Sequence, residues 1–227
     1  MKKIIFSIFC LLGLNSCNGQ KNNLNDSEIK LIGELKLDKE TAQEIKSLTN
    51  GNFELAKGFE DRENLYDDIP ELKNYSKKLP KAIKINSKED IATKIVKDFK
   101  QKLIEKGLII YKSEENYNQK DDVITILKSE NKYEPLYFEG TNAVNYDMNT
   151  PQLIEKLKVW DKLYGIELNG VGFDYLSGDF KKLPDDLRSF STEMYDFCPD
   201  IVDQGVGDLD KLIEALKDSK SFFLWWD

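Results

Sequence analysis

The chain has 227 residues with a formal net charge of −8, and it contains no histidine. The missing imidazole excludes Ser-His-Asp and Cys-His catalysis and histidine-containing zinc sites, and the acidic balance argues against nucleic acid as a partner. Hydrophobic residues make up 40% of the chain, enough for a true core in one large domain or two small ones.

The first seventeen residues have the pattern of a secretory signal. Two lysines precede an apolar run at residues 4–14, and a serine leads to Cys17. The apolar run is too short to span a bilayer as a helix, and its order of basic, apolar and small residues is typical of a signal peptide. Residues 14–17 resemble the lipobox of bacterial lipoproteins. We expect cleavage after residue 16 and lipidation of Cys17; an ordinary signal peptide with an incidental cysteine is the alternative.

An asparagine-rich polar stretch follows Cys17 and predicts a flexible tether, which we place at residues 17–36. Such a composition buries too little apolar surface to offset the entropy lost on ordering. A tether would hold the folded part away from a membrane that the protein contacts through its N-terminal lipid. We therefore expect a location in the bacterial cell envelope outside the cytoplasm, at the outer membrane.

Residues 37–112 are predicted to form an N-terminal α/β region. In chain order we expect a helix after Asp38, a strand at residues 53–56, an exposed charged loop at residues 57–80, a helix capped by Ser87 and ended by Gly107, and a buried strand at residues 108–111. A charged break at residues 112–122 is expected to separate this region from the next.

Residues 113–227 are predicted to form a C-terminal domain. Strands are expected at residues 123–127, 135–138, 166–173 and 222–227. They alternate with helices that begin at Thr150 with a capping hydroxyl, at residues 184–186, and after Asp208. Amphipathic helices that alternate with strands indicate an α/β or α+β fold, with a mixed β-sheet and packed amphipathic helices.

Three segments of this region are familiar in their order and spacing. They are residues 164–174, the Phe-Cys-Pro-Asp run that begins the segment 197–205, and the terminal Trp-Trp-Asp. Together they resemble the bacterial domain-of-unknown-function family 4253, over roughly residues 116–227. That family has no established activity, so the resemblance implies no reaction.

These motifs supply the candidate binding or structural residues of the chain, which are Phe197, Cys198, Pro199, Asp200, Asp203, Gln204, Trp225, Trp226 and Asp227. The first six form a helix–turn–helix corner in which they serve geometry, or four of them, Cys198, Asp200, Asp203 and Gln204, make a polar pocket. Adjacent tryptophans in a strand face opposite sides, so one should pack in the core while the other could line a groove. An antiparallel return of the last strand predicts that Asp227 lies near the corner.

Chemistry at this corner is weakly indicated. Cys198 is the one thiol left after Cys10 is cleaved and Cys17 acylated, so no internal disulfide is possible, and we expect a buried, inert thiol rather than a nucleophile. The carboxylates of Asp196, Asp200, Asp203 and Asp227 could hold Mg²⁺ or Ca²⁺, but a chain with 41 acidic residues provides many such groupings. We predict no metal and no cofactor.

The sequence thus favours a lipid-anchored module that binds a protein or a small molecule and has no catalytic role. Two alternatives stay open. One is a metal-dependent hydrolase that uses carboxylates of the second half. The other is an acidic, immunity-type protein that neutralises a basic toxin.

Overall fold

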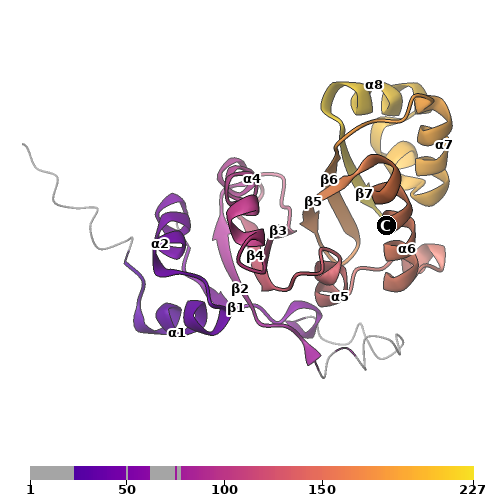
Figure 1. Cartoon of the computed structure of the whole chain (residues 1–227). Coiled ribbons are helices and arrows are strands. Elements are labelled where there is room, and N and C mark those ends of the chain that lie inside the picture. Colours follow the sequence, from indigo (N-terminus) through magenta and orange to yellow (C-terminus); the bar gives the residue numbers. More distant parts are fainter. Residues whose placement is uncertain (1–22, 50, 62–74, 76–77) are drawn as a thin grey trace, which may run out of the picture.

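The computed structural model describes residues 23–49, 51–61, 75 and 78–227. Within these residues the chain forms a seven-stranded sheet in the order β1-β2-β4-β3-β5-β6-β7 (Figure 1). Neighbouring strands are antiparallel except β3 and β5, which are parallel. The strands are β1 (Glu54–Leu55), β2 (Ala82–Ser87), β3 (Leu108–Glu114), β4 (Asp122–Lys128), β5 (Ile166–Val171), β6 (Tyr175–Phe180) and β7 (Ser221–Trp225).

Helices cover both faces of this mixed sheet, as the predicted fold class requires. The α-helices are α1 (Asp26–Leu35), α2 (Lys39–Leu48), α4 (Glu89–Ile104), α5 (Glu134–Glu139), α6 (Thr150–Tyr164), α7 (Leu187–Phe197) and α8 (Leu209–Ser219). Short 3₁₀ turns lie at Gly58–Asp61 and Val144–Tyr146, and a π-helix lies at Ile201–Val206. None of the helices in the described ranges combines the length and hydropathy of a membrane span.

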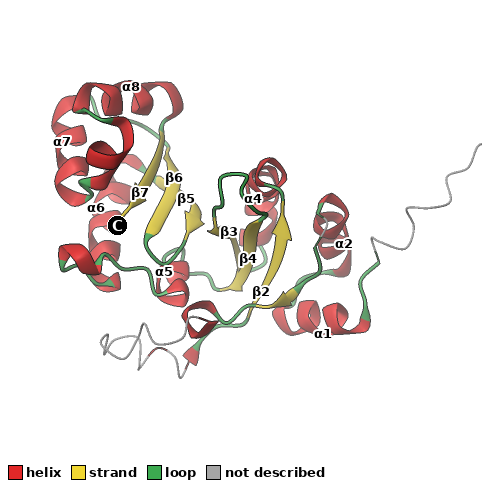
Figure 2. Cartoon of the chain, turned by 180° about the vertical axis from the view of Figure 1, so that it is seen from behind, coloured by secondary structure: helices red, strands yellow, loops and turns green. Residues whose placement is uncertain are grey.

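Strands β2, β4 and β3 bury both of their faces, whereas β5, β6 and β7 pack one face against helices. Helices α1, α2 and α4 pack on one face of β2, β4 and β3, where Ile95 and Phe99 of α4 meet the strand isoleucines Ile85, Ile110 and Ile124. Helices α5 to α8 gather on the other face, over β5, β6 and β7 (Figure 2). The apolar stripes of α4, α6 and α8 therefore predicted their buried sides.

The flexible tether predicted at residues 17–36 is wrong for its second half, because residues 26–35 form α1. Asn25 caps this helix in a reciprocal box with Glu28. The Glu28 side chain is buried, and its carboxylate accepts hydrogen bonds from Lys46 Nζ at 2.5 Å and from the Phe53 main-chain nitrogen at 2.9 Å. Ile32 and Leu35 of α1 also pack in the core, so the apolar residues after Asn25 were a signal that the tether prediction overlooked. Cys17 and the signal peptide lie outside the described residues.

The predicted break at residues 112–122 is also wrong. Strand β3 continues to Glu114 and turns directly into β4, with which it pairs antiparallel. Lys112 is buried within this hairpin, and two carboxylates compensate its charge. Its ammonium group lies 2.9 Å from a Glu115 oxygen and 3.5 Å from an Asp122 oxygen. A charged sequence is thus compatible with a central strand here.

Several smaller expectations need correction. Ser87 ends β2 and does not cap α4, whose N-cap residue Lys88 makes no side-chain cap bond. Residues 135–138 belong to α5 rather than a strand, with proline in the first turn. Asn149, not Thr150, caps α6, because the Thr150 hydroxyl donates to the Thr141 carbonyl instead. Strand β5 ends at Val171. The cap of α8 by Asp208 is confirmed.

Candidate functional site

The C-terminal residues close onto the corner between α7 and α8. Strand β7 returns from α8, and the Trp226 indole nitrogen donates to the Phe197 carbonyl at 3.1 Å. Their rings meet edge to face, with centroids 5.5 Å apart. The main-chain nitrogen of Asp227 donates to an Asp200 carboxylate oxygen at 3.0 Å. The predicted approach of Asp227 to the corner is confirmed.

Asp200 is the polar centre of this corner. It is buried, and its carboxylate accepts hydrogen bonds from the Asp227 main chain, from the Gln204 amide at 2.9 Å and from the Tyr146 hydroxyl. Burial alone raises the pKa of Asp200, but these hydrogen bonds outweigh it and leave the pKa below its usual value. Because hydrogen-bond donors of the chain itself contact this carboxylate, the role of Asp200 is to stabilise the corner.

Cys198 and its neighbours also serve the corner. The Cys198 thiol is fully buried and donates to the Trp225 carbonyl at 2.9 Å. Burial raises the pKa of this thiol to about 12, so it stays protonated at neutral pH. The Pro199 carbonyl accepts the main-chain N–H groups of Val202 and Asp203, which starts the π-helix.

The four aspartates that could have formed a metal site are not brought together as one. Asp203 is exposed, and its carboxylate accepts a hydrogen bond from the Tyr195 hydroxyl at 3.1 Å. Asp196 and Asp227 are exposed, whereas Asp200 is buried. In the described part of the chain no group of three or more acidic, cysteine or histidine residues is arranged to hold a metal ion.

The two tryptophans point to opposite faces, as predicted for a strand. Trp226 lies in the core, whereas Trp225 is half-buried on the other side of β7. The ring of Trp225 crosses the sheet edge and lies on Gly205 of the π-helix, where an added Cβ would come within 2.6 Å of the ring. Gly205 is therefore needed for close approach rather than for a turn.

Trp225 begins a continuous group of four aromatic side chains, which we call the aromatic row. The ring of Phe223 lies 5.6 Å from Trp225 and stacks on Tyr175 at 5.5 Å, with an interplanar angle of 13°. Tyr117 completes the row from the β3–β4 turn, with its ring edge-on to Phe223 at 6.1 Å. Tyr117 is 61% exposed and has a φ of +49°, a left-handed conformation that is unfavourable for a bulky residue.

The aromatic row lies on a face of β5, β6 and β7 that we call the open face. Helices α5 to α8 pack on the opposite face (Figures 1 and 2). The side chains of β6 and β7 alternate, so that those on the helix side are buried and those on the open face are partly or largely exposed. The described helix nearest to the open face is α4, which reaches β5 through Lys100.

Acidic groups adjoin the aromatic row. Glu115 accepts a hydrogen bond from the Ser177 hydroxyl at 2.8 Å and pairs with Lys112, which also lies near the fully buried Asp122. Gly170 makes room for this contact, since a Cβ there would come within 2.4 Å of Glu115. Two carboxylates thus share one ammonium group. Burial and then the charges of Glu115 and neighbouring acids raise the pKa of Tyr117.

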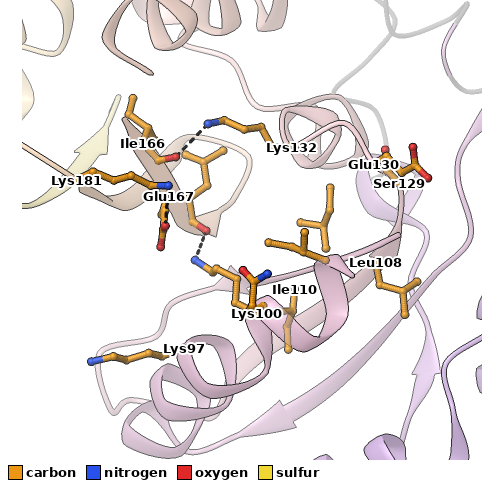
Figure 3. Close-up of a pocket in the computed structure, with 14 residues that line it drawn as sticks. Lys97, Lys100, Leu108, Ile110, Ser129, Glu130, Lys132, Ile166, Glu167 and Lys181 are labelled. Atoms are coloured by element: carbon orange, nitrogen blue, oxygen red, sulfur yellow. Dashed lines mark hydrogen bonds and ion pairs between the residues drawn. The ribbon is translucent and has the colours of Figure 1, made fainter. Parts of the chain in front are cut away.

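Two of the cavities in the described part of the chain lie elsewhere on the sheet. The larger, of about 510 Å³, lies between β3 and β5 beside α4 (Figure 3). It has an apolar floor and four lysines at its walls, which are Lys97, Lys100, Lys132 and Lys181. The smaller, of about 240 Å³, is polar and contains Ser113, Thr125 and Glu139. We call the larger cavity the lysine cleft.

The sequence indicated part of these surfaces and missed the rest. Phe223 and Trp225 stood in a recognised terminal strand, but Tyr175 was missed because β6 was not predicted. The sequence of this strand, Tyr-Leu-Ser-Gly-Asp-Phe, does not strictly alternate between apolar and polar residues, so its signal is weak. Tyr117 and Glu115 were hidden in a segment interpreted as a charged break.

Comparison with known proteins agrees with the resemblance seen in the motifs. Residues 123–227, just under half of the chain, match the family described as "Domain of unknown function (DUF4253)". No curated protein and no solved structure matches the chain. The matched region contains Tyr175, Phe223 and Trp225, whereas Tyr117 and Glu115 come just before it.

Proposed function

We propose that this protein is a binding module without catalytic activity, and that its open face binds a basic segment of a protein partner. The observation that carries the proposal is the aromatic row beside the Glu115 carboxylate. Aromatic rings attract ammonium and guanidinium groups through their faces, and adjacent carboxylates strengthen that attraction. The net charge of −8 supports association with a basic partner.

The strained turn at Tyr117 supports the same interpretation. Tyr117 and Asn118 both have positive φ, and the Gln119 main-chain nitrogen donates to the Asn116 carbonyl at 2.9 Å, as in a tight hairpin turn. Asparagine tolerates this conformation, but tyrosine gains nothing locally from it. The ring contacts Phe223 at one edge and is still 61% exposed, so much of its surface is available to a ligand. An immunity-type protein that neutralises a basic toxin is one form of this proposal.

Tryptophan fluorescence tests the proposal directly. Trp160 and Trp226 are buried, so a change in emission on titration should report Trp225. The probe is a blocked peptide of alternating Lys and Ser, and its glutamate counterpart is the charge control. We expect the lysine peptide to change the emission and the glutamate peptide to leave it unchanged.

Two variants complete this test. Tyr117→Ala should weaken binding of the lysine peptide by about threefold to thirtyfold, equivalent to about 0.5–2 kcal/mol of cation–π attraction. Val144→Ala removes a comparably exposed apolar side chain from another surface, and it should bind the peptide normally. Equal affinity for both peptides, or no effect of Tyr117→Ala, would contradict the proposal.

The lipoprotein expectation enters the proposal as its location. A module that Cys17 anchors through acyl chains would present the open face from the envelope surface, outside the cytoplasm and at the outer membrane. Radiolabelled palmitate should enter the wild-type protein and fail to enter Cys17→Ser. Equal labelling of the two proteins would exclude lipidation at Cys17.

A further inference from the structure

The seven-stranded sheet is incomplete at the lysine cleft. Strands β3 and β5 pair in the described sheet at a single position, Lys112 with Gly170. Towards the beginning of both strands they separate, and the cleft of about 510 Å³ opens between Leu108–Ile110 of β3 and Ile166–Leu168 of β5. The edges of both strands therefore face the same cavity (Figure 3).

Side chains take the place of a neighbouring strand along β5. The Ile166 carbonyl accepts a hydrogen bond from Lys132 Nζ at 3.1 Å, and the Leu168 carbonyl accepts one from Lys100 Nζ at 2.8 Å. The Ile166 main-chain nitrogen donates to Asp161 at 2.8 Å. Residues two apart on a strand direct their main-chain groups to the same side. Polar side-chain atoms thus occupy the positions that an added strand would use.

The walls of the cleft define the chemistry of such a strand. Apolar side chains that include Ile104, Ile109 and Leu168 form the floor, and the walls carry four lysines but two glutamates. Two of these lysines already pair with carboxylates, Lys132 with Asp161 at 2.6 Å and Lys181 with Glu167 at 3.4 Å. Lys97 and Lys100 therefore supply most of the positive charge that a ligand would meet. Burial lowers the pKa of Lys100, so a carboxylate brought beside it would stabilise its charged form.

We propose that the lysine cleft is a strand-addition site, in which an extended acidic segment of a protein partner pairs with the edge of β5. The main chain of the segment replaces Lys100 and Lys132 at the carbonyls of Leu168 and Ile166. The released ammonium groups then pair with carboxylates of the segment, while its alternate apolar side chains contact the floor. This site is separate from the open face.

Lysines on a strand edge can also serve the opposite purpose, because they discourage pairing with other chains. The two roles predict opposite effects of removing the lysines. If the lysines prevent strand pairing, their removal strengthens it. If the lysines bind the acidic segment, their removal weakens it. The experiment is designed to separate these outcomes.

The probe is a blocked eight-residue peptide of alternating Asp and Val, titrated into the purified protein and followed by amide chemical shifts in NMR. We expect the amide signals of residues 166–169 to shift. A peptide with Lys in place of Asp should bind at least tenfold more weakly. A peptide with N-methyl groups on alternate amides of the pairing edge should lose binding to the same extent, because it cannot donate to the β5 carbonyls.

The variant Lys100→Met/Lys132→Met should bind the Asp-Val peptide at least tenfold more weakly. Lys94→Met removes an exposed lysine of α4 that does not line the cleft, and it should bind normally. Tighter binding by the double variant, equal binding of the acidic and basic peptides, or full binding of the N-methylated peptide would each overturn the proposal. The peptide comparisons need only the wild-type protein, so they decide the matter if the double variant fails to fold.

Discussion

Replacement of Trp226 should show that the terminal Trp-Trp-Asp motif stabilises the fold. Trp226→Ala removes a ring that is 4% exposed, its edge-to-face contact with Phe197, and the hydrogen bond to the Phe197 carbonyl. Truncation of a buried aromatic side chain typically costs about 3–5 kcal/mol. Since a protein of this size loses about 2–4 °C per kcal/mol, we expect the melting temperature to fall by about 6–20 °C.

A second substitution at Trp226 separates packing from hydrogen bonding. Trp226→Phe keeps an aromatic ring in the site but leaves the buried Phe197 carbonyl without its donor, which should cost about 1–3 kcal/mol. Val159→Ala, at an exposed position of α6, is the control and should change stability by less than about 0.5 kcal/mol.

Urea unfolding followed by circular dichroism measures all three variants, with thermal melts as a second assay. The ordering Trp226→Ala, then Trp226→Phe, then Val159→Ala is the expected result. A loss of less than about 1 kcal/mol for Trp226→Ala would refute the argument, because burial and hydrogen bonding of this ring would then contribute little.

Three further predictions concern buried polar groups. Glu28→Ala should lower stability by about 3–5 kcal/mol in urea unfolding, because it leaves Lys46 buried without its carboxylate partner; a cost below about 1 kcal/mol would show that this ion pair contributes little. The Cys198 thiol should react slowly with a thiol reagent in the native protein and promptly in denaturant, and fast native reaction would contradict its raised pKa. Because the pKa of Asp200 is lowered in the folded protein, its contribution to the free energy of unfolding is complete above its unfolded pKa of about 4. That contribution is lost as the pH falls through the folded pKa. Between pH 6 and pH 2 the melting temperature should therefore fall less steeply for Asp200→Asn than for wild type. Asp185→Asn, at an exposed position, should keep the wild-type slope.

The sequence predicted the elements whose stability comes from apolar periodicity. The stripe through Ile95 and Phe99 placed α4, and Asp208 gave the start of α8 correctly. Elements that were missed include α1 and the last part of β3, where charged residues are buried: Glu28 pairs with Lys46, and Lys112 pairs with Glu115. In these cases the partner that makes burial favourable comes from another part of the chain.

The candidate surfaces also include residues that the sequence predicted and residues that it missed. The motif residues of the corner were identified, and their convergence followed from helix and strand lengths, because the return of β7 is a short-range geometric consequence of α8. The aromatic row was not predictable, because Tyr117 reaches Phe223 only after the β3–β4 hairpin pairs with the rest of the sheet. The lysine cleft depends on the separation of β3 from β5, which no local pattern encodes.

The hydrophobic core on the helix side joins the two halves of the sheet across the single paired position of β3 and β5. Tyr111 of β3 and Leu127 of β4 belong to the same buried cluster as Val171 of β5 and Leu176 of β6. Close packing on that side holds the halves together where main-chain pairing is minimal. The lysine cleft is therefore a preformed opening, and a segment that enters it does not have to separate the strands first.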